Sequence, residues 1–373
     1  MFTGIRLLFL IMSFEVLTLI ERVYAWEVNN VTRFKRQEER WIWSSDAEAE
    51  TNHIDNRVTE EPNPCIPVVW PAAPDFKAPG RRISQVKCYE YMWAIKVITS
   101  EAKRLQDCSD HLLDIIGGRD ALPLEFPHMA GIGWKTVSGE WNFKCGGSLI
   151  SSKFVVTAAH CSMASDRDTS IIDVTPKIVR LGYNKISERS SNGQDAKIMK
   201  VITHPKYEPP KKYNDIALIE LEKEVRFTMY VQPACLIVGP DDVLVGQKAM
   251  LTGWGVTDAA DPTTSPELQV AEISVLDSRL CDRLYRRSCS RHWCGMAENQ
   301  LCAGVLDGGV DACQGDSGGP LQLKFNLPRS NGENIYRLIG VTSFGIGCAL
   351  PNYPGIYTRI SSFLDWIEPI VWK

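Results

Sequence analysis

The sequence of 373 residues has little net charge and no long apolar run outside its amino-terminal end. Its 41 Lys and Arg residues nearly balance 45 Asp and Glu residues, which leaves a net charge of −4. This balance gives no reason to expect a nucleic-acid partner, because such binding needs an excess of positive charge. A membrane-spanning helix needs about 20 apolar residues, and no segment supplies them. We therefore expect neither nucleic acid nor a membrane among the partners.

The first 25 residues have the features of a secretory signal peptide. Arg6 precedes the apolar run of residues 7–12, and Val23-Tyr24-Ala25 ends in the small residue that a cleavage site needs. Glu15 interrupts the apolar stretch, which argues against a membrane anchor. We expect a secreted, extracellular protein, in which the sequon Asn30-Val31-Thr32 is either glycosylated or unused.

Twelve cysteines suit an oxidising compartment, where disulfides persist. The number is even, so every thiol can be paired, although the sequence leaves the connectivity open. A zinc site made by Cys281, Cys289, Cys294 and Cys302 is the alternative. Their spacing lacks paired Cys-x-x-Cys motifs, which favours disulfides over zinc.

The most informative segment is Asp311-Ala312-Cys313-Gln314-Gly315-Asp316-Ser317-Gly318-Gly319-Pro320. Its glycines let the backbone bend sharply and approach a substrate closely. A serine hydroxyl is a poor nucleophile alone and needs a base and a group that orients the base. His160, in Thr157-Ala158-Ala159-His160-Cys161, and Asp215, which follows Tyr213-Asn214, supply both. We predict a catalytic triad of His160, Asp215 and Ser317.

These segments, in the order His, Asp, Ser, resemble the chymotrypsin-like (S1-type), trypsin-like serine proteases, and more narrowly the insect clip-related proteases called snake-like. Ile115-Ile116-Gly117-Gly118 matches the activation sequence of that family, and residues 125–130 strengthen the snake-like resemblance. The resemblance implies an all-β fold of two six-stranded antiparallel β-barrels with a C-terminal helix, preceded by a small cysteine-containing pro-region. It divides the chain into a signal peptide (1–25), a pro-region with a degenerate or absent clip-like module (26–114) and a trypsin-like serine protease domain (115–373).

The local patterns favour the same architecture. Short apolar or alternating runs separated by turn residues, such as Phe154-Val155-Val156-Thr157, are typical of all-β barrels. Residues 362–372 carry apolar side chains at helical spacing, which predicts an amphipathic helix. Residues 89–105 contain neither Gly nor Pro and also have a pattern compatible with a helix.

The resemblance implies roles for the remaining site residues. The backbone N–H groups of Gly315 and Ser317 are expected to form an oxyanion hole. Asp311 is expected at the floor of the specificity pocket, between walls formed by Gly345 and Gly355, which predicts cleavage after Arg or Lys. Lys211-Lys212 borders neighbouring subsites in this family, which indicates either a preference for acidic residues or only a solvated basic turn. We expect no metal and no cofactor.

The resemblance also implies activation by cleavage before Ile115. The new α-amino group would pair with Asp316 and order the pocket and the oxyanion hole. Asp114 departs from the Arg, Lys or apolar residue that relatives carry before this bond. We therefore expect an upstream activating protease that either has unusual specificity or cuts nearby first.

The disulfides implied by the resemblance are Cys145–Cys161, Cys281–Cys302, Cys313–Cys348 and Cys108–Cys235. The last of these would tie the pro-region to the protease. Among the four remaining cysteines, we expect Cys289–Cys294 and Cys65–Cys88.

Together these features predict a secreted zymogen of a serine endopeptidase. Its place would be an extracellular proteolytic cascade of the insect immune or developmental type, with a protein substrate and a serpin-type inhibitor. Two alternatives remain. One is a non-catalytic protease-like adaptor, which the presence of all three triad residues disfavours, and the other is a venom or digestive protease.

Overall fold

The computed structural model describes residues 70–109, 125–188, 190–239, 244–258, 261–308, 315–326, 334–346 and 350–373. The described residues all belong to one compact unit, Asn63–Lys373. Several predictions fall outside this part of the chain. They concern the signal peptide, the sequon at Asn30, the activation bond between Asp114 and Ile115, the pocket residue Asp311, and the pair Cys313–Cys348.

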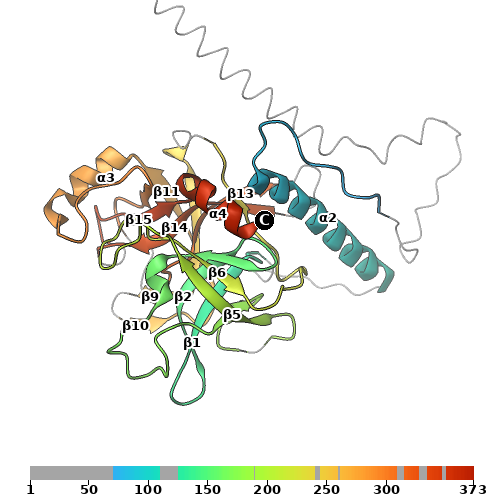
Figure 1. Cartoon of the computed structure of the whole chain (residues 1–373), viewed down its shortest axis with the longest axis horizontal. Helices are drawn as coiled ribbons and strands as arrows, with labels where there is room; N and C mark the ends of the chain where they lie inside the picture. The colour runs from blue at the N-terminus through green and yellow to red at the C-terminus, as the bar shows by residue number, and fades with distance from the viewer. Residues whose placement is uncertain are drawn as a thin grey trace, which may run out of the picture. The chain divides into compact units, whose positions relative to one another are not determined.

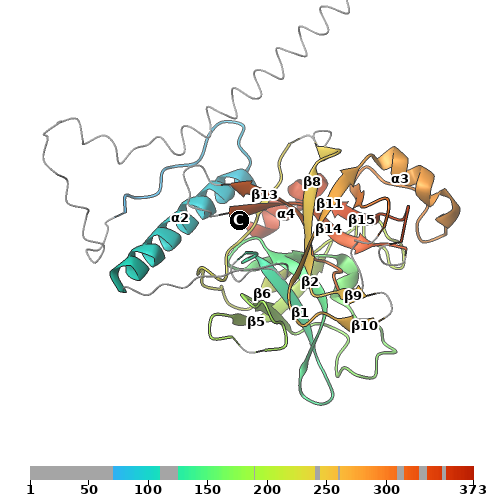
Figure 2. The same cartoon turned by 180° about the vertical axis from the view of Figure 1, so that it is seen from behind.

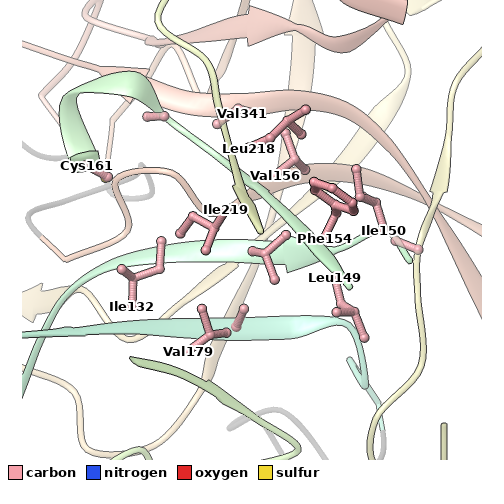
Figure 3. Packing of buried hydrophobic residues seen from close by; sticks show 14 of the residues in the cluster. Ile132, Leu149, Ile150, Phe154, Val156, Cys161, Val179, Leu218, Ile219 and Val341 are labelled. Atoms are coloured by element: carbon pink, nitrogen blue, oxygen red, sulfur yellow. The ribbon is translucent and has the colours of Figure 1, made fainter. Parts of the chain in front are cut away.

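Six antiparallel strands form the first barrel, and they close in the order β1-β2-β3-β6-β5-β4. Their bounds are β1 Met129–Lys135, β2 Trp141–Leu149, β3 Phe154–Thr157, β4 Ile178–Leu181, β5 Gln194–Thr203 and β6 Ala217–Leu221. Apolar side chains from several of these strands fill the interior, as Figure 3 shows for Ile132, Val156, Val179 and Leu218. The apolar run at 154–156 belongs to β3, and every residue of this strand is buried, because β3 is part of the closed barrel.

Six further strands close a second ring in the order β13-β8-β11-β12-β15-β14, completed by the pairing of β13 with β14. Their bounds are β8 Lys248–Gly253, β11 Gln269–Leu276, β12 Gln300–Gly304, β13 Pro320–Asn326, β14 Asn334–Phe344 and β15 Gly355–Arg359. The short strand β7 (Cys235–Leu236) adds to β14 in parallel, and β9 (Val256–Asp258) pairs with β10 (Asp261–Thr264). The prediction of two six-stranded antiparallel barrels is confirmed.

Helices are few. They comprise α2 (Ile83–Ser109), α3 (Ser278–Leu284), α4 (Leu364–Val371) and the short 3₁₀ turns η1 (Ala159–Ser162), η3 (Tyr285–Ser288) and η4 (Ile360–Phe363). The turn η4 and helix α4 confirm the predicted C-terminal helix. The helix expected over 89–105 is also present and starts six residues earlier. There the side chain of Gln85 accepts a hydrogen bond from the backbone N–H of Arg82. Within the described residues, no helix is both long enough and apolar enough to span a membrane.

Helix α2 lies against the barrels, next to α4 and β7 (Figures 1 and 2). Most of its buried side chains recur on one face, at Ser84, Cys88, Tyr91, Met92 and Ile95, and Val86 is buried outside this face. This face carries Cys88 and so presents its sulfur to the second barrel.

A disulfide joins Cys88 of α2 to Cys235 of β7, with the two Cα atoms 5.1 Å apart. The predicted pairs Cys108–Cys235 and Cys65–Cys88 are therefore wrong. Cys108 follows Cys88 by 20 residues in the same helix, which places its backbone about 30 Å further along the axis. A disulfide spans at most about 7 Å between Cα atoms, so Cys108 is too far from Cys235.

Candidate active site

The position of His160 is set by the end of the first barrel's third strand. β3 ends at Thr157, and the chain turns at once into η1, which carries His160. Cys161, next in sequence, forms a disulfide with Cys145 of β2, as predicted. The turn is therefore anchored covalently to a neighbouring strand. This anchor fixes the backbone position from which the imidazole of His160 extends.

Asp215 lies at the entrance to β6, behind a residue with an unusual backbone. Asn214 has φ of 53°, a left-handed conformation that asparagine tolerates better than most residues. Its side-chain amide donates to the carbonyl of Lys206 and accepts from the amide of Asn299 at 2.7 Å. These contacts hold the bend that directs Asp215 inward, where it is 3% exposed.

The carboxylate of Asp215 receives three hydrogen bonds. The ring Nδ1 of His160 lies 2.8 Å from Oδ2, and the backbone N–H of His160 donates to Oδ1 at 2.9 Å. The hydroxyl of Ser343 donates to Oδ2 at 2.5 Å. A carboxylate can only accept, so the proton of the neutral ring must sit on Nδ1. Nε2 then carries a lone pair, as a general base requires.

The environment of Asp215 acts on its pKa in two directions. Burial raises the pKa, because it penalises the charged form, while the charge of His160 and the hydrogen bonds from His160 and Ser343 lower it. The net pKa of Asp215 is below its ordinary value. The carboxylate therefore stays ionised and can stabilise a positive imidazolium on His160.

Ser317 lies on the loop that leads into β13 of the second barrel. Its carbonyl accepts a hydrogen bond from the N–H of Gly146 at 2.8 Å and lies 3.6 Å from the sulfur of Cys161. The N–H of Gly318 donates to the carbonyl of Thr342 at 2.9 Å. These contacts place Ser317 beside the turn that carries His160, where the two barrels meet.

The glycines around Ser317 are required by shape. Gly315 and Gly318 have φ of 105° and 78°, a region open mainly to glycine. A Cβ atom on Gly315 would lie 2.8 Å from the Cα of Gly255, and one on Gly318 would collide with Thr157. The segment can therefore adopt this turn only with glycine at positions 315 and 318. Gly315 and Ser317 lie two residues apart in it.

The carboxylate of Asp316 points away from Ser317, into a space between two other glycines. It is 9% exposed and accepts a hydrogen bond from the N–H of Gly255 at 2.8 Å. A Cβ atom on either Gly253 or Gly255 would collide with this carboxylate. Two glycines thus make room for one buried acid, whose expected partner, the amino group of Ile115, lies outside the described residues.

The expected pocket walls lie on the second barrel. Gly345 is exposed just beyond the end of β14, and Gly355 is the buried first residue of β15. These two strands pair with each other, which brings the two glycines to neighbouring positions. Asp311, the expected floor of the pocket, lies outside the described residues.

Two residues of the site were missed from sequence. Ser343 donates to Asp215 although 128 positions separate them, and Asn214 sets the bend before Asp215. A signal for Ser343 exists, because Thr342-Ser343 places two buried hydroxyls directly after the run Leu338-Ile339-Gly340-Val341, which has no polar side chain. This pattern does not indicate which acidic side chain the two hydroxyls contact.

The four cysteines of the zinc alternative are paired in disulfides. The predicted pairs Cys281–Cys302 and Cys289–Cys294 are present, so the zinc alternative for these four residues is wrong. Among the described residues, one group with metal-ligand atoms close together combines His160 with Cys145 and Cys161. Those two sulfurs form a disulfide and offer no thiolate.

Comparison with known proteins agrees with this arrangement. The trypsin family profile matches residues 115–367. The chain is 38% identical to serine protease snk of Drosophila melanogaster over 316 residues, which is 83% of this chain and 69% of the relative. Serine protease Hayan of the same organism is 35% identical over 86% of this chain, which spans about half (48%) of that relative's length. The proclotting enzyme of Tachypleus tridentatus is 36% identical over 68% of this chain and 65% of its own length.

Proposed function

Because this chain belongs to the trypsin family of serine proteases, we propose that it is the secreted zymogen of an endopeptidase that cuts proteins after Arg or Lys. The observation that carries the proposal is the hydrogen-bonded pair of His160 and Asp215, with Ser317 beside it at the junction of the barrels. Hydrolysis by a serine endopeptidase needs this set of a nucleophile, a base and an orienting acid.

In this proposal, the hydroxyl of Ser317 attacks the scissile carbonyl. Nε2 of His160 takes the hydroxyl proton and later gives it to the leaving amine. Asp215 holds the ring in the tautomer that leaves Nε2 free, and its negative charge stabilises the imidazolium. The backbone N–H groups of Gly315 and Ser317 stabilise the oxyanion, and the turn at Gly315 that only glycine allows supports this role.

Specificity for Arg or Lys rests on Asp311, six residues before Ser317, and on the two glycines Gly345 and Gly355. A carboxylate at the floor of a pocket pairs with an incoming guanidinium or ammonium group. Walls without side chains leave room for the long aliphatic stems of these residues.

We propose that activation follows cleavage before Ile115, at the boundary between the pro-region (26–114) and the protease domain (115–373). The activation sequence Ile115-Ile116-Gly117-Gly118 supports this step, because cleavage would free an α-amino group that can pair with the buried carboxylate of Asp316. After this cut, the disulfide Cys88–Cys235 keeps helix α2 attached to the protease domain. The activated enzyme is then two chains joined by the disulfide Cys88–Cys235.

The setting we propose is an extracellular protease cascade. The similar proteins include a proclotting enzyme and a clotting factor G beta subunit of Tachypleus tridentatus, and phenoloxidase-activating factors of Holotrichia diomphalia. By analogy, the substrate is another protein precursor, the activator is an upstream protease, and the inhibitor is of the serpin type. Asp114 before the activation bond argues against self-activation by an enzyme that cuts after Arg or Lys.

The test uses the full-length zymogen with a recognition site for a specific protease placed directly before Ile115. The cut enzyme is assayed on peptides with Arg, Lys, Leu or Asp before the scissile bond. We expect turnover only after Arg and Lys, and its loss in Ser317→Ala. An absence of turnover from enzyme with a verified Ile115 amino terminus contradicts the proposal.

A further inference from the structure

Arginine is concentrated in one short segment between β11 and β12, residues 277–294. The segment consists of α3, η3 and the loop closed by Cys289–Cys294, and α3 projects from the strands of the second barrel in Figures 1 and 2. It carries five arginines against two aspartates, whereas the whole chain has a net charge of −4. The net charge of the chain therefore conceals a locally positive surface.

Four of these arginines share one face of the helical part of the segment. Arg283 follows Arg279 by four positions, and it precedes Arg286 and Arg287 by three and four positions. Residues at these spacings are neighbours on a helix, and all four side chains are exposed. Cys281 and Tyr285, which are also four positions apart, are buried on the opposite face.

Most of the positive charge in this segment is not neutralised by an acid. Arg279 pairs with Asp277 at 3.0 Å. Among the described residues, no carboxylate pairs with the other four arginines, which we call the arginine patch: Arg283, Arg286, Arg287 and Arg291. Asp282 lies beside them in sequence, but its Oδ1 accepts a hydrogen bond from the backbone N–H of Met296 at 2.6 Å. The patch can therefore attract an external anion.

The backbone beneath the arginine patch is fixed, although its charges repel one another. Like charges three or four positions apart destabilise a helix. The disulfide Cys281–Cys302 ties α3 to β12, and Cys289–Cys294 closes the loop that follows η3. The hydroxyl of Tyr285 also donates a hydrogen bond to the carbonyl of Pro354. A surface that is ordered before it binds loses less entropy when a ligand arrives.

The chemistry of this surface indicates the class of ligand. Tyr285 and Trp293 are only 1% and 4% exposed, and none of the exposed large apolar side chains of the described residues lies in the segment. Membrane surfaces are bound through apolar side chains, single-stranded nucleic acids through exposed aromatic rings, and protein partners through an apolar interface core. A polymer of sulfated sugars needs none of these features, because its oxyanions suit the paired N–H groups of guanidinium.

We propose that the arginine patch is a binding site for a sulfated polysaccharide. This inference goes beyond the proposed function, since binding requires no catalysis, and it uses only the proposed secretion, which brings the protein to such polymers. The patch contains none of the residues assigned to catalysis or to the specificity pocket. Its role is to hold the protein on an extracellular surface that carries the polymer.

The test measures binding of fluorescein-labelled heparin to the full-length zymogen by fluorescence anisotropy. We expect binding that weakens steeply as the NaCl concentration rises from about 0.1 to 0.3 M, because counterions are released from the polymer. Chemically desulfated heparin should bind about tenfold more weakly or worse. The triple variant Arg283→Gln, Arg286→Gln, Arg287→Gln should show a similar loss, because glutamine keeps the helix propensity but removes the charge.

A matched control removes the same charge from another part of the surface. Lys197, Lys223 and Arg226 are exposed residues of the first barrel, on or just after β5 and β6. Their joint replacement by Gln should leave heparin binding unchanged. Equal weakening in this control, or equal binding of sulfated and desulfated heparin, overturns the proposal. Tighter binding of a poly-glutamate peptide or of an oligonucleotide than of heparin also overturns it, in favour of that other polymer.

Turnover of small peptides separates this inference from the proposed function. After a designed cut before Ile115, both triple variants should turn over Arg peptides as the wild type does, which shows that they are folded. If the wild type turns over no peptide but its heparin binding depends on the arginine patch, the proposed function fails and this inference stands. The single variants Arg283→Gln, Arg286→Gln and Arg287→Gln, each expected to weaken binding about two- to fourfold, provide the test if the triple variant does not fold.

Discussion

The hydroxyl of Ser343 donates a hydrogen bond of 2.5 Å to the same carboxylate oxygen of Asp215 that contacts the ring of His160. Ser343 lies at the end of β14 in the second barrel, whereas Asp215 and His160 belong to the first. The orientation of the acid therefore depends on how the two barrels pack. Ser343 acts on catalysis through Asp215, as a positioning residue.

Removing this hydroxyl should slow catalysis without abolishing it. A hydrogen bond to a charged group contributes about 1.5–3 kcal/mol, so Ser343→Ala should lower kcat/KM by about 10- to 100-fold. Most of the loss should appear in kcat, because the hydroxyl acts on the chemical step through Asp215. Ser343→Thr keeps the hydroxyl and should recover most of the rate. Equal rates for the alanine and threonine variants would show that the hydroxyl has no such role.

The disulfide from α2 should determine whether the two chains of the activated enzyme stay covalently linked. After the cut before Ile115, the wild-type protein should run as one species on a non-reducing denaturing gel and as two after reduction. Cys88→Ser should separate into two chains without reductant, because Cys88–Cys235 is lost. Cys108→Ser should stay linked. Separation in Cys108→Ser but not in Cys88→Ser would contradict the observed pairing.

The ion pair between α2 and α4 should contribute to the stability of their contact. Arg82 bonds to the carboxylate of Glu368 through two nitrogens, and the hydroxyl of Ser84 donates to the same carboxylate at 2.6 Å. Glu368 is nearly buried, so Arg82→Met would leave its charge without a cation. We expect a loss of about 2–4 kcal/mol in the free energy of unfolding.

Asp365 provides the control for this pair. It also contacts Arg82 but is 92% exposed, so Asp365→Asn should change stability by less than about 1 kcal/mol. Both variants can be compared by chemical denaturation at constant pH. Similar losses in the two variants would show that burial of Glu368 does not set the size of the effect.

Buried His128 should make the protein less stable in acid. Burial lowers its pKa to about 4, and a hydrogen bond with Gln322 opposes this shift. The unfolded chain, with an ordinary pKa near 6.5, binds a proton between about pH 6.5 and 4 while the folded chain does not. The free energy of unfolding should therefore fall as the pH drops through this window, by on the order of 2–3 kcal/mol from this residue.

The contribution of His128 can be separated from those of other groups by comparison with His128→Phe. Its ring packs against those of Phe126 and Tyr336, so an aromatic replacement keeps the surroundings apolar. The variant should show a shallower decline between pH 6.5 and 4 in denaturation experiments at several pH values. An unchanged slope would assign the acid sensitivity to other groups.

Much of the architecture follows from local patterns in the sequence. The buried run at 154–157, the terminal helix and the disulfide Cys289–Cys294, five positions apart, each depend on neighbours along the chain. The segments around His160, Asp215 and Ser317 are also recognisable one at a time, because each needs particular small or polar residues for its own turn.

Tertiary structure decided the relationships that join distant segments. The spacing of cysteines does not show that the buried face of α2 presents Cys88, and not Cys108, to Cys235. Nor does adjacency in sequence show that Lys211 is neutralised by Glu208 while Lys212 is directed onto Phe344. The periodicity of a segment sets which side chains share a face. Only the packing of elements far apart in the sequence sets what that face meets.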